Sequence, residues 1–145
     1  MIDVAGLKVT LAGPPPVNFA PETVNEMAIL LRTVIEAPAA HSLGQAQLAL
    51  ASFRASGAAA SIGKLFAGFA DPTSTDVPLD LLLPSLQAPT LVMWGQNDRL
   101  FPSALADVVV AGVAGASKLL IADAGHFAQI DNAPAVIAGL QAFLA

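Results

Sequence analysis

The stretch Ala88–Pro102, with the sequence APTLVMWGQNDRLFP, decides the fold. Its first half is a short continuous run of apolar residues, Thr90–Trp94, which is typical of a β-strand buried on both faces. Its second half is polar and places Asp98 four residues past the end of that run. A second apolar run, Lys118–Ala122, is followed in the same way by His126. Each run therefore predicts a buried strand, followed by a loop that carries one chemically active side chain.

Helical patterns alternate with these two strands. One helix is expected to begin near Ser103, and a closing helix has Pro134 in its first turn. The apolar positions of the closing helix are Val136, Ile137, Leu140, Phe143 and Leu144. The order strand, helix, strand, helix over residues 88–145 predicts a parallel sheet of the α/β class.

The two loops are expected to bring Asp98 and His126 together, because ligands and catalytic groups gather at the carboxyl ends of parallel strands. A carboxylate that accepts from one imidazole nitrogen leaves the other nitrogen as a general base. The spacing alone also allows a turn or capping role for Asp98 and a structural role for His126. Asp123 is a rival acid for which we favour a turn role, and His41 is expected at the surface.

Residues 17–70 are expected to form a small helical subdomain. The first helix has Glu22 and Glu26 in its early turns, and Pro38 is expected to end it. The second opens at Ser42, whose S-x-x-Q pattern with Gln45 predicts a cap. A third, weaker pattern covers about residues 58–69. The apolar positions of the first two helices are Val24, Met27, Ala28, Leu31, Val34 and Ile35, then Ala46, Ala49, Leu50 and Phe53. Five large side chains are candidates to line a substrate pocket, although their helical spacing suits packing in the core at least as well: Phe19, Met27, Phe53, Phe66 and Phe69.

Composition excludes several classes of protein. Of 145 residues, 55% are hydrophobic and 12% are charged, which excludes intrinsic disorder. A net charge of -5 with six Lys and Arg makes a nucleic-acid partner improbable. The absence of Cys and the presence of two His leave little to bind a metal. No uninterrupted apolar stretch of about 18–20 residues occurs, so no membrane span or targeting segment is expected, and we expect a cytoplasmic protein.

The stretch Ala88–Ala145 closely resembles the C-terminal part of the α/β-hydrolase fold. The resemblance implies that Asp98 is the acid of a catalytic triad and His126 its base. Two mild departures lie at the start of the last helix, where Asp131 stands in place of the family's usual Glu and Pro134 stands one position later than its usual Pro. Residues 17–70 resemble the family's helical cap, and residues 1–7 resemble the strand that leads into it.

The resemblance divides the chain into three parts. Residues 1–16 are the end of a core strand and a connector, residues 17–76 the helical cap, and residues 77–145 the C-terminal β-α-β-α part of the core. The fold class is therefore α/β, a partial α/β-hydrolase fold in which helices flank parallel strands.

The family's nucleophile is not among these residues. It is carried on a G-x-S-x-G elbow that precedes the acid in the chain. None of the eight serines lies in that pattern: Ser42, Ser52, Ser56, Ser61, Ser74, Ser85, Ser103 and Ser117. We therefore expect a fragment that lacks the nucleophile and is inactive by itself.

The implied activity is hydrolysis of an ester or related bond in a small, largely apolar substrate, without metal or organic cofactor. Esterases, lactonases, C–C-bond hydrolases, haloalkane dehalogenases and acyltransferases all suit the same acid and base. The alternative is a non-catalytic remnant that binds an apolar ligand or a partner. Its exposed sheet edge would then pair with a second copy or with a separate N-terminal half.

Overall fold

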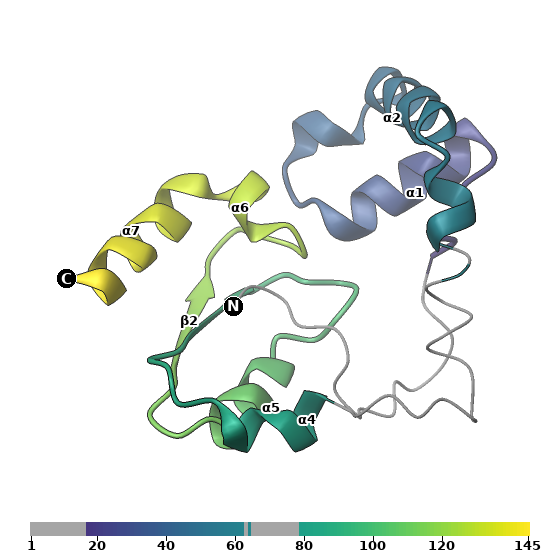
Figure 1. Ribbon diagram of the computed structural model, residues 1–145. Coiled ribbons are helices and arrows are strands. Elements are labelled where there is room, and N and C mark those ends of the chain that lie inside the picture. Colours follow the sequence, from purple (N-terminus) through teal and green to yellow (C-terminus); the bar gives the residue numbers. More distant parts are fainter. Residues whose placement is uncertain (1–16, 63, 65–78) are drawn as a thin grey trace. The chain divides into compact units, whose positions relative to one another are not determined.

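A computed structural model describes residues 17–62, 64 and 79–145 of the chain (Figure 1). These residues form two compact units. Residues 33–36 and 79–145 make up the first, which we call the sheet unit, and the remaining described residues make up the second, the helical unit.

Two parallel strands form the centre of the sheet unit. Strand β1 (Leu91–Gly95) pairs with β2 (Ser117–Ile121), with Gly95 opposite Ile121 at the carboxyl ends of both. The other elements of this unit are α4 (Leu79–Leu82), η2 (Leu83–Ser85), α5 (Leu105–Gly112), α6 (Ala128–Asp131) and α7 (Ala133–Leu144). Helix α5 connects the two strands, as a parallel pair requires. The predicted α/β class is therefore confirmed.

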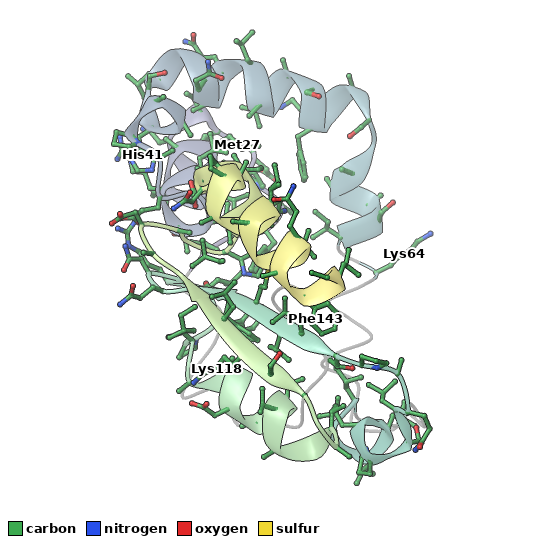
Figure 2. The ribbon with its side chains drawn as sticks, turned by 90° about the vertical axis from the view of Figure 1, so that its left-hand side faces the viewer. Met27, His41, Lys64, Lys118 and Phe143 are labelled. Atoms are coloured by element: carbon green, nitrogen blue, oxygen red, sulfur yellow. The ribbon has the colours of Figure 1, made fainter. Side chains whose placement is uncertain are left out.

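The side chains of β1 enter two hydrophobic cores on opposite faces of the sheet. Val92 and Trp94 pack with Val109 of α5, whereas Met93 packs with Val136 of α7. Successive side chains of a strand point to opposite faces, so one five-residue strand supplies both cores. Figure 2 shows α7 on one side of the two strands and α5 on the other. All of β1 is buried, as its continuous apolar sequence predicts.

The prediction that the second strand is buried is wrong. Its residues Ser117, Lys118 and Leu120 are exposed, and Ile121 alone is fully buried. Residues of β1 enter both hydrophobic cores, whereas Leu119 and Ile121 of β2 pack only in the core that contains Val136 of α7. The closing helix behaves similarly, because only Val136 of its predicted apolar positions is buried. Four of those positions are exposed: Ile137, Leu140, Phe143 and Leu144.

The helical unit has its own core between α1 (Val24–Val34) and α2 (Leu43–Ala55). The buried members of this core are Met27, Ala28, Ala46 and Leu50, and Phe53 packs against them. For Met27 and Phe53 this favours the packing interpretation over a pocket. Of the third predicted helix, residues 58–62 and 64 are helical. Its remainder, with Phe66 and Phe69, lies outside the described residues.

Helix α1 ends at Val34, four residues before Pro38, which has no N–H to donate to the Val34 carbonyl. The Val34 carbonyl accepts from the N–H of Phe127, and the Glu36 N–H donates to the carboxylate of Asp131. The first bond satisfies a carbonyl for which Pro38 offers no helical N–H, and the second takes the N–H that another turn would direct to residue 32. Pro38 also begins the short 3-10 helix η1 (Pro38–His41).

Side chains cap the amino ends of α1 and α2. At α1 the Thr23 Oγ1 accepts from the Glu26 N–H (3.2 Å), and the Glu26 carboxylate accepts from the N–H groups of Glu22 and Thr23. This reciprocal arrangement is a capping box, and its T-x-x-E signal is present in the sequence. At α2 the predicted cap is confirmed, because Ser42 Oγ accepts from the Gln45 N–H at 3.2 Å.

The α1 cap predicts a pH-dependent contribution to stability. The N–H groups of Glu22 and Thr23 hold the pKa of Glu26 below its ordinary value of 4.5. Because the folded-state pKa is lowered, the cap stabilises the helical unit above about pH 4.5 and loses this contribution as the pH falls through the lowered value. We expect Glu26→Gln to lower the thermal midpoint at neutral pH and not in acid, as followed by far-ultraviolet circular dichroism. Glu22→Gln, which removes the same charge from a neighbouring exposed residue, is the control. Equal shifts for Glu26→Gln at both pH values would contradict the assignment.

Candidate active site

The backbone of the loop that follows β1 fixes the carboxylate of Asp98. Its Oδ1 accepts from the N–H of Leu100 (2.8 Å) and the N–H of Phe101 (2.9 Å). The buried Trp94 of β1 supports the same loop, because its indole N–H donates to the Phe101 carbonyl at 3.1 Å. The turn role considered for Asp98 is therefore real, and it orients the carboxylate so that Oδ2 faces the second loop.

His126 lies in that second loop, and its imidazole contacts Asp98. The distance from His126 Nδ1 to Asp98 Oδ2 is 3.0 Å, with the Asp98 side chain 0% and the His126 side chain 17% exposed. The rings of Phe101 and Phe127 flank the imidazole, and their centroids lie 5.6 and 5.2 Å, respectively, from the centroid of the His126 ring. An ionised Asp98 that accepts from Nδ1–H makes Nε2 the nitrogen with the lone pair, which is the tautomer of a general base. The two side chains that the loops were expected to bring together are thus in contact.

The backbone on both sides of His126 is also held. The N–H of Gly125 donates to Asp131 Oδ2 at 2.8 Å, and the N–H of Phe127 donates to the Val34 carbonyl at 3.0 Å. In the sequence Asp131 stands out only as a departure from a family pattern, and its bond to Gly125 was not predicted. The sequence signal that could have indicated this bond is a carboxylate five residues after His126. No sequence signal indicates that the Val34 carbonyl accepts from Phe127.

Gly95 allows the two loops to approach each other at the end of β1. A Cβ at this position would lie 1.9 Å from the Gly125 carbonyl oxygen and 2.7 Å from that of Ala124. Both atoms belong to the backbone of the His126 loop, which cannot give way as a flexible side chain would. Only glycine therefore permits the observed separation of the strand from the loop.

The other candidate residues lie elsewhere. Asp123 is exposed in a turn with φ 53°, and the carboxylate on His126 Nδ1 is that of Asp98. His41 is half-buried in η1 rather than fully at the surface, and its carbonyl accepts from Arg32 at 3.5 Å. Within residues 17–62, 64 and 79–145, no group of three or more His, Cys, Asp or Glu gathers to hold a metal ion. Nor does any described helix combine the length and apolar character needed to cross a membrane.

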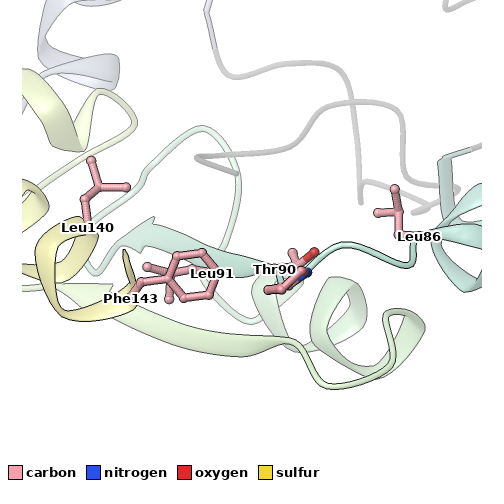
Figure 3. Close-up of a pocket in the computed structure, with 6 residues that line it drawn as sticks. Leu86, Thr90, Leu91, Leu140 and Phe143 are labelled. Carbon is pink, nitrogen blue, oxygen red and sulfur yellow. The ribbon is translucent and has the colours of Figure 1, made fainter. Parts of the chain in front are cut away.

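A shallow apolar pocket of about 250 Å³ lies at the opposite end of β1 (Figure 3). It is lined by Leu86, Pro89, Thr90, Leu91, Leu140 and Phe143. In Figure 3, Leu140 and Phe143 come from α7, Leu91 from the start of β1, and Thr90 from the residue before it. Asp98 and His126 follow the carboxyl ends of the strands, so this pocket is not where a substrate would meet them.

Comparison with known protein families places residues 23–133 in a family model described as the alpha/beta hydrolase fold. Two curated relatives are named 2-hydroxy-6-oxononadienedioate/2-hydroxy-6-oxononatrienedioate hydrolase. The one from Klebsiella pneumoniae is 41% identical over 51 residues, which are 35% of this chain and 18% of that protein. The one from Escherichia coli is 38% identical over 53 residues, 37% of this chain and 18% of that protein. The matched segment therefore covers less than a fifth of either relative.

Solved structures show the same fold over nearly the whole chain. The 2-hydroxy-6-oxo-6-phenylhexa-2,4-dienoate hydrolase of Rhodococcus sp. strain RHA1 superposes with a TM-score of 0.74 at 18% identity, covering 99% of this chain and 53% of that one. A bacterial membrane phospholipase A gives 0.73 at 24% identity, covering 99% and 47%. The chain thus spans about half the length of these two proteins.

Replacing Gly95 tests how closely the two loops approach. We expect Gly95→Ala to lower the free energy of unfolding by about 3 kcal/mol, because the added Cβ meets backbone carbonyls. Urea unfolding measures this loss. Gly44→Ala in α2 is the control, since the nearest atom to its Cβ is Ser42 Oγ at 4.0 Å, and alanine there should stabilise by about 0.5–1 kcal/mol. A Gly95→Ala protein as stable as the parent would show that the loops are not this close.

Proposed function

The chain belongs to the family of α/β hydrolases, whose model matches residues 23–133, and from this premise we propose that Asp98 and His126 are the acid and base of a nucleophile–His–Asp triad. The observation that carries the proposal is the 3.0 Å contact between His126 Nδ1 and the fully buried carboxylate of Asp98. A buried carboxylate with one oxygen already bonded to two backbone N–H groups is rigidly placed to orient an imidazole.

The proposed chemistry follows from that tautomer. As a hydroxyl nucleophile attacks the carbonyl carbon of the substrate, its proton passes to Nε2 of His126, and the negative charge of Asp98 stabilises the imidazolium. His126 then gives the proton to the leaving group, which departs and leaves an acyl-enzyme. A water molecule repeats the exchange, releasing the acid product and returning the proton to the nucleophile.

We propose that the nucleophile is supplied by polypeptide outside these 145 residues. No serine of the chain lies in a G-x-S-x-G sequence. The chain also spans 47% and 53% of the two structures to which it is similar over nearly its full length. The 145 residues by themselves are then expected to be inactive.

The substrate is proposed to be a small, largely apolar molecule with an ester or related bond. Both curated relatives are instead named as hydrolases of 2-hydroxy-6-oxo dicarboxylates, which are charged compounds without an ester bond. That class is therefore to be assayed beside a simple activated ester, and turnover of only one of the two would decide between a charged and an apolar substrate. Phe101 and Phe127 support an apolar substrate, because their rings lie against the imidazole at which the reaction would occur.

A second candidate function is a non-catalytic module that binds a partner. The observation that favours it is that several large apolar side chains of the sheet unit are exposed. Leu120 of β2 and Ile137 and Leu144 of α7 are exposed, although each is a large hydrophobic residue. Both functions predict a larger assembly, but only the hydrolase predicts an activated nucleophile.

Labelling with a serine-directed fluorophosphonate separates the two functions. We expect the protein, isolated from its source, to have an intact mass well above 14.7 kDa and to gain the mass of one adduct. Mass spectrometry before and after labelling measures both quantities. A mass of 14.7 kDa without an adduct would refute the hydrolase proposal and favour the binding module.

Substitution of the pair tests their catalytic roles. In the active protein, His126→Ala and Asp98→Asn are each expected to lower kcat by about 10⁴-fold, since the first removes the base and the second stabilises the wrong tautomer. Steady-state hydrolysis of an activated ester measures the loss. His41→Ala, which removes the chain's other histidine, serves as the control and should leave the rate unchanged. Full turnover in His126→Ala would exclude the proposed mechanism.

A further inference from the structure

Two hydrogen bonds hold the backbone at the residues immediately before and after His126. The Gly125 N–H donates to Asp131 Oδ2 (2.8 Å), and the Phe127 N–H donates to the Val34 carbonyl (3.0 Å). The contact of the imidazole with Asp98 fixes the side chain, whereas these two bonds fix the peptide groups from which it projects.

The carboxylate of Asp131 also holds a second segment. Its Oδ1 and Oδ2 lie 2.9 and 3.0 Å from the N–H of Glu36, so one half-buried side chain joins residues 125 and 36. The side chain of Glu36 in turn pairs with Arg99 at 2.8 Å, next to Asp98 in the other loop. All of these residues belong to the sheet unit.

Gly125 is packed closely at this point. A Cβ on Gly125 would lie 3.3 Å from the Glu36 nitrogen and 3.4 Å from both Asp131 Oδ2 and the Val34 carbonyl oxygen. The first of these distances is tighter than an ordinary van der Waals contact, and the other two are at its lower limit. Gly125 therefore leaves little space for a side chain at the point where Asp131, Glu36 and Val34 meet the loop.

We propose that Asp131 is a positioning residue for His126, acting through the backbone of Gly125 and of Glu36. This role rests on the proposed function, in which His126 is the base. Hydrogen bonds from N–H groups to an ionised carboxylate are stronger than those between neutral groups, so one such acceptor can anchor two segments. The placement matters because an error of about 1 Å at a reacting group can cost about 10²-fold in rate.

The tautomer of neutral His126 reports its placement without requiring activity. With histidine labelled with ¹⁵N, NMR shows which ring nitrogen carries the proton, and loss of signals in His126→Gln assigns them. We expect the Nδ1–H form in the parent protein, because Asp98 accepts there. In Asp131→Asn we expect the Nε2–H form of His126 to appear beside the Nδ1–H form. The amide NH₂ of the new residue cannot accept from the N–H of Gly125 or Glu36 that it faces, so the loop is held less firmly. The same variant should lower kcat about 10- to 100-fold with little change in KM.

Two controls separate this role from a general effect of charge or stability. Asp107→Asn removes a carboxylate that pairs with Lys118 on another part of the same unit, and should leave the tautomer and kcat unchanged. Asp131→Glu keeps the carboxylate and should largely restore both. A folded Asp131→Asn protein with the parent tautomer and the parent kcat would overturn the proposal.

If Asp131→Asn does not fold, hydrogen exchange in the parent protein and the tautomer in Asp131→Glu decide the question. Slow exchange of the Gly125 and Glu36 amides, with the Nδ1–H form kept in Asp131→Glu, would support the role. Exchange of the Gly125 amide as fast as that of an exposed amide would overturn it, since the bond to Asp131 would then be absent.

The two proposals can fail separately. An inactive protein whose tautomer changes only in Asp131→Asn would refute the hydrolase function and keep the role of Asp131 in placing His126. An active enzyme in which Asp131→Asn changes neither the tautomer nor kcat would refute the role of Asp131 and keep the function.

Discussion

The parallel register of β1 and β2 is the constraint on which the candidate site depends. Gly95 is paired with Ile121, so both strands end at the same level and their loops leave the sheet side by side. The N–H groups of Gln96 and Asn97 extend this contact by donating to the carbonyls of Ile121 and Ala124, both at 2.9 Å. Asp98 and His126 are 28 residues apart in the chain and meet because of this pairing. A shift of register by one residue would turn every side chain of β2 to the opposite face and separate the loops.

Local patterns explain why the centre of the site could be predicted from the sequence. The apolar run of β1, the polar loop after it and the helix that follows are each encoded within a few residues, and parallel sheets place successive loops at one edge. The prediction for β2 failed because its apolar residues indicated a strand but carried no information on which of its faces is covered. Leu119 and Ile121 pack in the core with α7, and no residue of β2 belongs to the core with α5. Leu119 and Leu120 look alike in the sequence, yet one is half-buried and the other exposed.

The parts of the site that could not be predicted depend on contacts between distant residues. Asp131 and Glu36 are separated by 95 positions, and their bond joins a carboxylate to a backbone N–H rather than to a recognisable partner side chain. Helix α1 ends four residues before Pro38, and the Val34 carbonyl, which the proline leaves without a helical donor, accepts from Phe127. The proline indicated the end of the helix, but no local pattern indicated the distant partner.

The bonds around His126 have a consequence for how this region tolerates change. Val34 contributes a carbonyl oxygen and Glu36 contributes a backbone N–H, groups that almost any amino acid provides. The geometry of residues 34–36 thus depends on the number of residues rather than on their identity. Inserting or deleting one residue there would pull both anchors away from the loop, whereas most replacements would keep them. Proline at position 36 is the exception, because it lacks the N–H that Asp131 binds. Constraint on this segment would therefore be visible as a fixed length among related chains, even where their residues differ.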